Sequence, residues 1–190
     1  GNVAAVSRGR GHWVIERFMD DRAADEILGS GKVSLVYGAN VSCHVEDFVN
    51  YARLVTRLIG TDGVFVFEDP YFPDIVASTS YDQVYDEHVW YFTISFINNV
   101  FVPMGMHVFD CEHIGVHGGE LRMYVGNKNK YPATPAVAEW LGRENDLEGK
   151  LALLDANIKK SKAALRDILL GLKKEGKTLA GFGASSKGVI

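Results

Sequence analysis

Two short apolar runs on either side of a helical stretch constrain the fold most strongly. Val33–Tyr37 (VSLVY) is rich in β-branched and aromatic residues, and Val64–Glu68 (VFVFE) is apolar up to its final glutamate, as in a buried parallel strand. Between them, Glu46–Ile59 has apolar residues at helical spacing. These apolar residues are Phe48, Ala52, Val55 and Ile59. The strand–helix–strand order predicts an α/β sheet of the doubly wound, Rossmann-like type.

Further elements extend this unit in both directions. Before this strand–helix–strand unit, we predict a strand at His12–Phe18 and a helix at Asp21–Leu28. A helix at Phe92–Pro103 follows the unit, with its apolar side buried. Met106–Val116 and Glu120–Val125 then alternate as the two strands of a hairpin. Such late antiparallel strands commonly close an otherwise parallel sheet.

A long helix with a stripe of leucines is predicted between the sheet region and the last residues of the chain. Pro132–Pro135 is a linker, in which Thr134 is the expected N-cap of the helix that follows. The stripe advances in steps of three and four residues, which predicts packing against another element. Its members are Leu147, Leu151, Leu154, Ile158, Leu165, Ile168 and Leu172. We therefore divide the chain into residues 1–131, 132–176 and 177–190.

Composition excludes several classes of function. The chain has 190 residues, 47% of them hydrophobic, and a net charge of −4 that gives no basic surface for nucleic acid. Its two cysteines, Cys43 and Cys111, are too few for a disulfide framework or a four-cysteine zinc site. No apolar run is long enough to span a membrane, and no signal-like segment opens the chain. A reducing cytoplasm is the expected compartment.

Ser80–Tyr91 (SYDQVYDEHVWY) is the stretch with the most chemistry. Tyr85, Glu87 and His88 fall within four positions. If the stretch is helical, Tyr85 and His88 share one face and Glu87 lies on the neighbouring one. A phenol, an imidazole and a carboxylate in one small volume can move a proton. The alternative is a solvated acidic helix whose aromatic residues dock on the core.

Two other clusters are weaker signals. His107, Cys111 and His113 would share one strand face, but the two histidines would be roughly 20 Å apart and cannot hold one ion. We therefore expect no metal there, and we treat His113 and His12 as structural. We predict a strand at Thr178–Gly181 that leads into Gly181–Lys187 (GFGASSK), a loop that would suit a phosphate because bare amides and an ammonium would face the anion. The spacing of a P-loop is absent.

Five motifs in chain order resemble one family, the S-adenosylmethionine-dependent C-methyltransferases of nucleotide-activated deoxysugars. The type that methylates C-3′ of a TDP-4-keto sugar is the most similar. The resemblance covers nearly the whole chain, and the ordered set is more specific than any single motif. The motifs are Ala39-Asn40-Val41-x-x-His44, Val64–Tyr71 (VFVFEDPY), Tyr85–His88 (YDEH), His117–Arg122 (HGGELR) and Gly181–Lys187 (GFGASSK).

The resemblance implies a protein of three parts: a zinc-binding lobe, a Rossmann-like methyltransferase domain and a second Rossmann-like domain that helps to hold the sugar nucleotide. Residues 1–131 would be the later part of the methyltransferase domain, 132–176 the linker and connecting helix, and 177–190 the start of the last domain. The zinc lobe and the glycine-rich cofactor loop have no counterpart here. We therefore expect an internal piece of a longer enzyme, inactive by itself.

The resemblance also implies roles for single residues. Methylation of carbon needs an enolate, made by removing a proton next to a ketone, and donors that hold the oxyanion. His88 would be the base and Glu87 would orient it. Tyr85 would contact the keto or hydroxyl oxygen, and His44 would be a second acid/base or oxyanion donor. Without the resemblance, His44 would more often be a satisfied histidine at a helix start.

Binding roles follow in the same way. S-adenosylmethionine is the implied cofactor, and its adenine would lie at the end of the first strand, with its sulfonium at the end of the next. The cofactor residues would be Phe18, Met19, Gly38, Ala39 and Asn40. The partner would be a nucleotide-sugar substrate, with Arg122 and Lys187 suited to its diphosphate. The substrate residues would be Asn40, Glu68, His117, Arg122 and Lys187.

Two other classes of function remain open. One is a non-catalytic nucleotide-binding domain that uses only Gly181–Lys187, whose affinity would not depend on His88. The other is an interaction module that forms homo-oligomers through the leucine stripe or an open sheet edge. A monomer in light scattering at high concentration would count against that second class.

Overall fold

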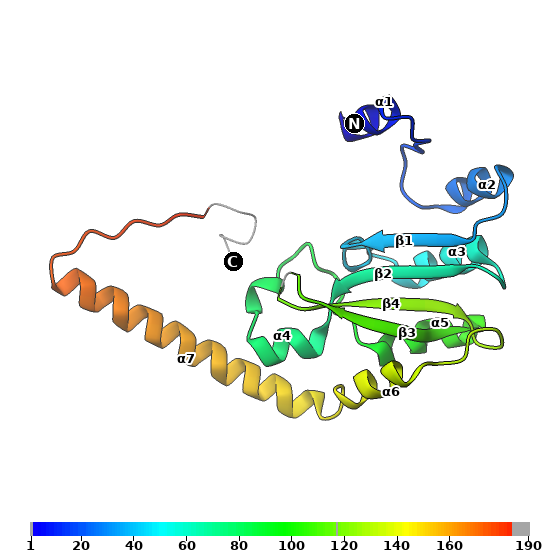
Figure 1. Cartoon of the computed structure of the whole chain (residues 1–190). Helices are drawn as coiled ribbons and strands as arrows, with labels where there is room; N and C mark the ends of the chain where they lie inside the picture. The colour runs from blue at the N-terminus through cyan, green and yellow to red at the C-terminus, as the bar shows by residue number, and fades with distance from the viewer. Residues whose placement is uncertain (1, 117, 184–190) are drawn as a thin grey trace.

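A four-stranded mixed sheet lies at the centre of the computed structural model, which describes residues 2–116 and 118–183 (Figure 1). The strand order is β1-β2-β4-β3, with β1 parallel to β2 and the other two pairs antiparallel. The strands are β1 (Leu35–Ala39), β2 (Val64–Pro70), β3 (Met106–Ile114) and β4 (Glu120–Asn127). The predicted α/β class and the late antiparallel hairpin are thereby confirmed.

Helices lie before, between and after these strands in the chain. The α-helices are α1 (Asn2–Gly9), α2 (Asp21–Gly29), α3 (Phe48–Ile59), α4 (Phe72–Ser78), α5 (Ile94–Phe101), α6 (Pro135–Gly142) and α7 (Leu147–Lys174). Three short 3-10 turns are η1 (Ser42–His44), η2 (Tyr81–Gln83) and η3 (Val102–Met104). The predicted helices at 21–28, 46–59 and 92–103 are present with ends shifted by a few residues, whereas the single long helix predicted after Thr134 is divided into α6 and α7.

An aromatic core fills the space between the sheet and the helices α3 and α5. Phe48 of α3 is fully buried, and its ring centroid lies 5.1 Å from that of Phe92 and 6.4 Å from that of Phe101. From the sheet, Phe65 and Phe67 stack with centroids 5.0 Å apart. Aromatic pairs of this kind add to the stabilisation that burial of apolar area provides. The alternating residues of β2 therefore fix which face of the sheet these helices cover.

Residues 12–18 do not form the strand that we predicted. A strand needs a partner for its backbone groups. Within the described part of the chain, β1 pairs only with β2. The segment instead lies against α1, where Arg8 donates to the carbonyl oxygen of Val14 and pairs with Glu16 at 3.1 Å. The alternation of apolar residues in the sequence was not enough to define a strand.

The stretch 80–91 is not a helix beyond the short turn η2. Its backbone is held by turns, such as the bond from the amide of His88 to the carbonyl oxygen of Tyr85 at 3.0 Å. The end of the stretch is held near β2, because Tyr71, which directly follows β2, forms an isolated parallel bridge with Phe92. The conditional prediction of a helical face is therefore wrong, although the turn still brings Tyr85 and His88 together.

Glu144, which follows α6, joins α6 to α5 through hydrogen bonds. Its carboxylate accepts from the amides of Ile94 at 2.5 Å and Ser95 at 2.9 Å, and from the Tyr71 hydroxyl at 2.9 Å. These amides are the first of α5 and have no partner within the helix. Burial, and then the adjacent Glu144 carboxylate, raise the pKa of Tyr71, so that its phenol stays protonated and donates.

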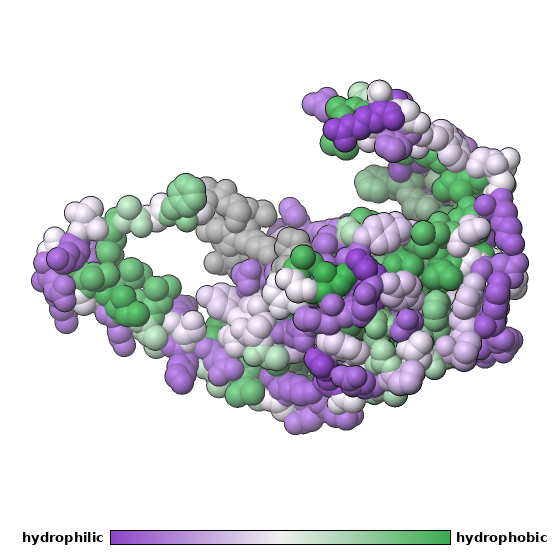
Figure 2. All heavy atoms as spheres, in the orientation of Figure 1, coloured by the Kyte–Doolittle hydropathy of each residue, from purple (hydrophilic) through white to green (hydrophobic). Residues whose placement is uncertain are grey.

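Among the stripe residues of α7 only Leu154 is buried, and Leu151 in the same half of the helix is exposed. The helix contacts α4. The later members Leu165 and Ile168 are exposed, and Figure 2 shows hydrophobic residues gathered on that half of the helix. No helix among residues 2–116 and 118–183 combines the length and apolar content needed to cross a membrane. Oligomerisation through this stripe stays a prediction.

Gly63, in the turn before β2, is a sensitive position. A Cβ there would lie 2.7 Å from the backbone oxygen of Ile59 and 2.9 Å from that of Val33, and backbone cannot move aside cheaply. We expect Gly63→Ala to lower the free energy of unfolding by about 2 kcal/mol in urea denaturation. Gly29→Ala is the matched control, because nothing lies within 4 Å of its Cβ. Equal stability of the two variants would contradict this packing.

Candidate active site

The site lies where β1 and β2 end. Beyond β1 the chain turns at Asn40, which has a φ of 52° and donates its amide to the carbonyl oxygen of Glu68 at 2.8 Å. The turn η1 follows, and the amide of Cys43 donates to Oδ1 of Asp69 at 3.2 Å. Asparagine tolerates the left-handed conformation better than most residues. The loop is thus folded back over the carboxyl ends of both strands, as in other open α/β sheets.

A second segment is clipped to this loop. The carbonyl oxygen of Cys43 accepts from the amides of Val89 at 2.9 Å and Trp90 at 3.3 Å. The indole of Trp90 donates to the carbonyl oxygen of Val45 at 2.7 Å. These bonds place the rings of His44 and His88 with centroids 5.0 Å apart. Two histidines that are 44 positions apart in the chain therefore share one site.

The hydrogen bonds of His88 define its tautomer. Its Nδ1 lies 2.9 Å from the carbonyl oxygen of Gln83, which can only accept, so Nδ1 carries the proton. Its Nε2 lies 2.9 Å from the hydroxyl of Tyr85. In the neutral ring, Nε2 holds a lone pair and accepts from that phenol. Burial, and then the Glu87 carboxylate, raise the pKa of Tyr85, which keeps the phenol a donor.

We predicted that the carboxylate of Glu87 orients His88, and the structure does not show this contact. The Glu87 side chain is exposed, and the carbonyl oxygen of Gln83 takes the orienting position instead. The backbone oxygen of Glu87 accepts from Nδ1 of His44 at 2.7 Å. Glu87 therefore positions His44 through its main chain, and that bond leaves Nε2 of His44 with a lone pair.

Cys43 completes a cluster that sequence reasoning missed. One ligand atom from each of Cys43, His44 and His88 lies within 4.8 Å of the others. Burial, and then the Asp69 carboxylate, raise the pKa of the Cys43 thiol, so that it is neutral. The adjacency of a cysteine and a histidine in the motif that ends at His44 was the signal available in the sequence.

The predicted cofactor residues are not gathered into one pocket. Phe18 is 95% exposed, while Met19 packs against the core. A Cβ at Gly38 would meet only Tyr51 at 3.8 Å and Val41 at 3.9 Å, so no protein atom requires glycine there. Ala39 and Asn40 lie at the strand end beside the histidines. A cofactor role for these five residues stays a prediction.

The predicted substrate residues divide between two places. Arg122 donates to Glu68 at 3.0 Å and to Glu112 at 2.5 Å, so its charge is already balanced by two carboxylates. Tyr37 donates to the same Glu68 carboxylate, and this network lies on the sheet face opposite the aromatic core. A diphosphate would have to displace a carboxylate from Arg122. His117 and Lys187 lie outside the described residues, as does most of Gly181–Lys187.

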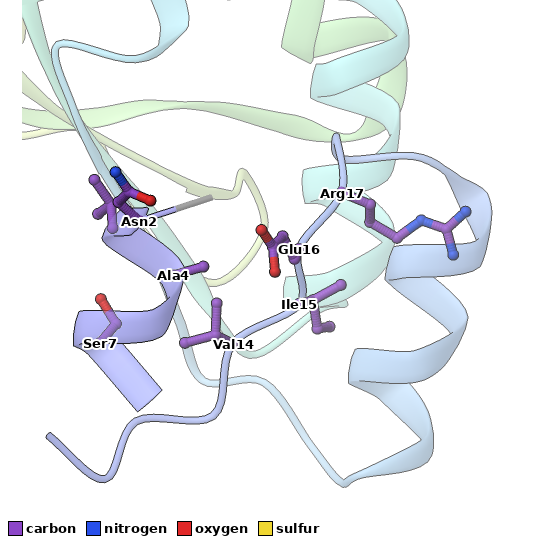
Figure 3. A pocket seen from close by; sticks show the side chains of 8 residues that line it. Asn2, Ala4, Ser7, Val14, Ile15, Glu16 and Arg17 are labelled. Atoms are coloured by element: carbon purple, nitrogen blue, oxygen red, sulfur yellow. The ribbon is translucent and has the colours of Figure 1, made fainter. Parts of the chain in front are cut away.

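His113 and His107 make structural contacts, which we expected for His113. His113 lies 2.9 Å from the Asp74 carboxylate and stacks on Trp140, with ring centroids 5.3 Å apart. His107 donates to the carbonyl oxygen of Tyr131 at 2.7 Å. Figure 3 shows a hollow beside α1, lined by residues such as Asn2 and Arg17; none of its lining residues belongs to the strand-end cluster.

Asp69 gives the site a pH-dependent stability. Burial raises the pKa of Asp69 from an ordinary 3.8 to about 6. Because the folded protein holds this proton more tightly, the contribution to stability is complete below pH 3.8 and is lost as the pH rises through 6. We expect the wild type to lose up to about 3 kcal/mol relative to Asp69→Asn across that range in urea unfolding. Parallel pH profiles of the two proteins would contradict a buried, protonated Asp69.

Comparison with known proteins gives two matches. Residues 115–190 match the family model of the C-methyltransferase C-terminal domain. The C-methyltransferase NovU of Streptomyces niveus is 29% identical over 193 residues, which cover 98% of this chain and 46% of that protein. The chain thus spans about half the length of this curated relative. The chain is therefore similar to a C-methyltransferase over nearly its whole length, and residues 115–190 match the C-terminal domain of such enzymes.

Proposed function

We propose that the protein carrying this sequence transfers a methyl group from S-adenosylmethionine to a carbon of a nucleotide-activated 4-keto-deoxysugar, through an enolate made by proton removal. The relatives support transfer of a methyl group to carbon. The hydrogen bond between Tyr85 and His88, beside His44 at the strand ends, is the observation that carries the proposal.

A carbon atom becomes a methyl acceptor only when it loses a proton. A ketone makes the neighbouring C–H bond acidic, and a base near neutral pKa must lie within hydrogen-bonding reach. His88 is fixed with Nε2 as its acceptor atom, because Gln83 holds the proton on Nδ1. It is therefore oriented to accept one more proton at a single defined atom.

Tyr85 controls access to that atom. In the structure its hydroxyl donates to Nε2 of His88. When a keto oxygen offers a better acceptor, the same hydroxyl can rotate toward it. That rotation would stabilise the developing oxyanion and free the imidazole lone pair for the carbon-bound proton. One hydrogen bond thus couples substrate binding to activation of the base.

His44 supplies a second site for protons next to the first. Its Nδ1–H is held by the backbone oxygen of Glu87, and its ring is exposed toward solvent. It can return a proton to the substrate oxygen or pass it to water after His88 has been protonated. S-adenosylmethionine, when bound, would supply an electrophilic methyl group to the enolate carbon.

The test uses the longest natural protein that carries this sequence, with methyl-labelled S-adenosylmethionine and a TDP-4-keto-deoxysugar. We expect the label on a sugar carbon next to the keto group, located by NMR of the product. The matched substrate is the same sugar reduced to an alcohol at C-4, which lacks an acidic C–H bond and should give no product. Label on oxygen or nitrogen, or equal turnover of the two sugars, would overturn the proposal.

A further inference from the structure

The cluster of Cys43, His44 and His88 has the composition of a transition-metal site. A thiol and two imidazoles each bring one ligand atom within 4.8 Å of the others. Thiolate and imidazole are ligands that zinc and similar borderline-soft ions prefer. The two segments that carry the three residues are fixed to each other by the bonds from Val89 and Trp90 to the carbonyl oxygen of Cys43.

Both imidazoles are oriented as metal-binding histidines usually are. His44 donates its Nδ1–H to the backbone oxygen of Glu87 at 2.7 Å, and His88 donates its Nδ1–H to that of Gln83 at 2.9 Å. Histidines that bind metals through Nε2 are commonly held in this way by a carbonyl or carboxylate at the other nitrogen. The protein thus already fixes the tautomer that coordination requires.

We propose that this cluster binds one divalent ion of the zinc type through Sγ of Cys43 and Nε2 of His44 and His88, with a fourth position open to water. Around a tetrahedral zinc ion, these ligand atoms would be about 3.3–3.6 Å apart. The exposed His44 leaves an approach from solvent, while Cys43 and His88 lie behind it. On coordination the S–H bond breaks and its proton passes to solvent.

Metal binding and the proton-transfer arrangement exclude each other. Nε2 of His88 has one lone pair, which now accepts from the hydroxyl of Tyr85. An ion at that atom must displace the phenol. The site would therefore be inhibitory, and this consequence, unlike the binding itself, depends on the proposed function.

Cobalt(II) titration of the 190-residue chain tests the binding without any substrate. We expect one ion per chain and a sulfur-to-cobalt charge-transfer band in the near ultraviolet, competed away by Zn²⁺ but not by Mg²⁺. Cys43→Ser should remove the band, and His44→Gln should weaken binding by at least about tenfold. Cys111→Ser is the matched control, because Cys111 is also a buried free cysteine and should leave the band unchanged.

Tyr85→Phe is expected to raise the affinity for cobalt, a change that a general loss of folding cannot produce. The variant removes the phenol that the ion must displace, so cobalt should bind about fivefold more tightly. A band that persists in Cys43→Ser, or an unchanged affinity in Tyr85→Phe, would overturn the proposal. Because no sugar or methyl donor is present, failure of this titration leaves the proposed methyl transfer untouched, and failure of the methyl-transfer assay leaves the binding result valid.

Discussion

Replacing His88 with asparagine is expected to lower the rate of methyl transfer by about 10²–10⁴-fold, the range that a positioned general base contributes. Asparagine has a similar size and retains a polar group near the carbonyl oxygen of Gln83, but it cannot accept the proton from carbon. The measurement is turnover of a TDP-4-keto-deoxysugar under saturating conditions by the full-length protein. KM should change less than kcat, because the lost interaction is made in the transition state.

The control for this variant is His12→Asn, which removes an exposed imidazole that is outside the strand-end site. We expect its turnover to match the wild type. Tyr85→Phe should retain the base and lose the oxyanion donor, with a fall of about 10²-fold. Wild-type turnover in His88→Asn would show that the imidazole is not the base, regardless of the turnover of Tyr85→Phe.

Glu144→Ala is expected to lower the free energy of unfolding by about 3 kcal/mol. The loss leaves the first amides of α5, at Ile94 and Ser95, without their acceptor, while the Tyr71 hydroxyl keeps only the carbonyl oxygen of Trp140. A carboxylate at the start of a helix also interacts favourably with the helix dipole, and this contribution would be lost as well. Urea unfolding, followed by far-ultraviolet circular dichroism, measures the difference.

Glu139→Ala is the matched control, because Glu139 is exposed and pairs with Arg143 at 3.6 Å. Exposed pairs of this type contribute little, so we expect a change below about 0.5 kcal/mol. Glu144→Gln should fall between the two, since an amide oxygen can still accept from one or two of the donors. Similar stability of the Glu144 and Glu139 variants would contradict the role of Glu144 in joining α6 to α5.

The βαβ unit and the closing hairpin could be predicted from the sequence because each has a repeating apolar pattern. Val64–Glu68 is apolar nearly throughout and becomes β2, and Glu46–Ile59 has the helical spacing that α3 uses. Residues 12–18 show why pattern alone fails. Whether an alternating segment pairs depends on a neighbouring strand, and this information is not local.

Only part of the site could be predicted from the sequence, because the contacts between its residues depend on the fold. His44, Tyr85 and His88 come together as the family motifs imply, although the geometry that joins them is a turn and not a helix. The orienting group of His88 is a backbone carbonyl, that of Gln83, and such a group leaves no trace in residue types. Cys43 escaped notice because one cysteine is not a motif until the fold places two histidines beside it.

Hydrogen exchange at carbon tests the central claim most directly. The full-length protein would be incubated in D₂O with the keto sugar and S-adenosylhomocysteine, so that enolates form but no methyl group is transferred. If the imidazole at position 88 takes the proton, NMR will show deuterium entering the carbon next to the ketone with wild-type protein and with His12→Asn, but not with His88→Asn. Deuterium entering at the wild-type rate in His88→Asn would contradict the account.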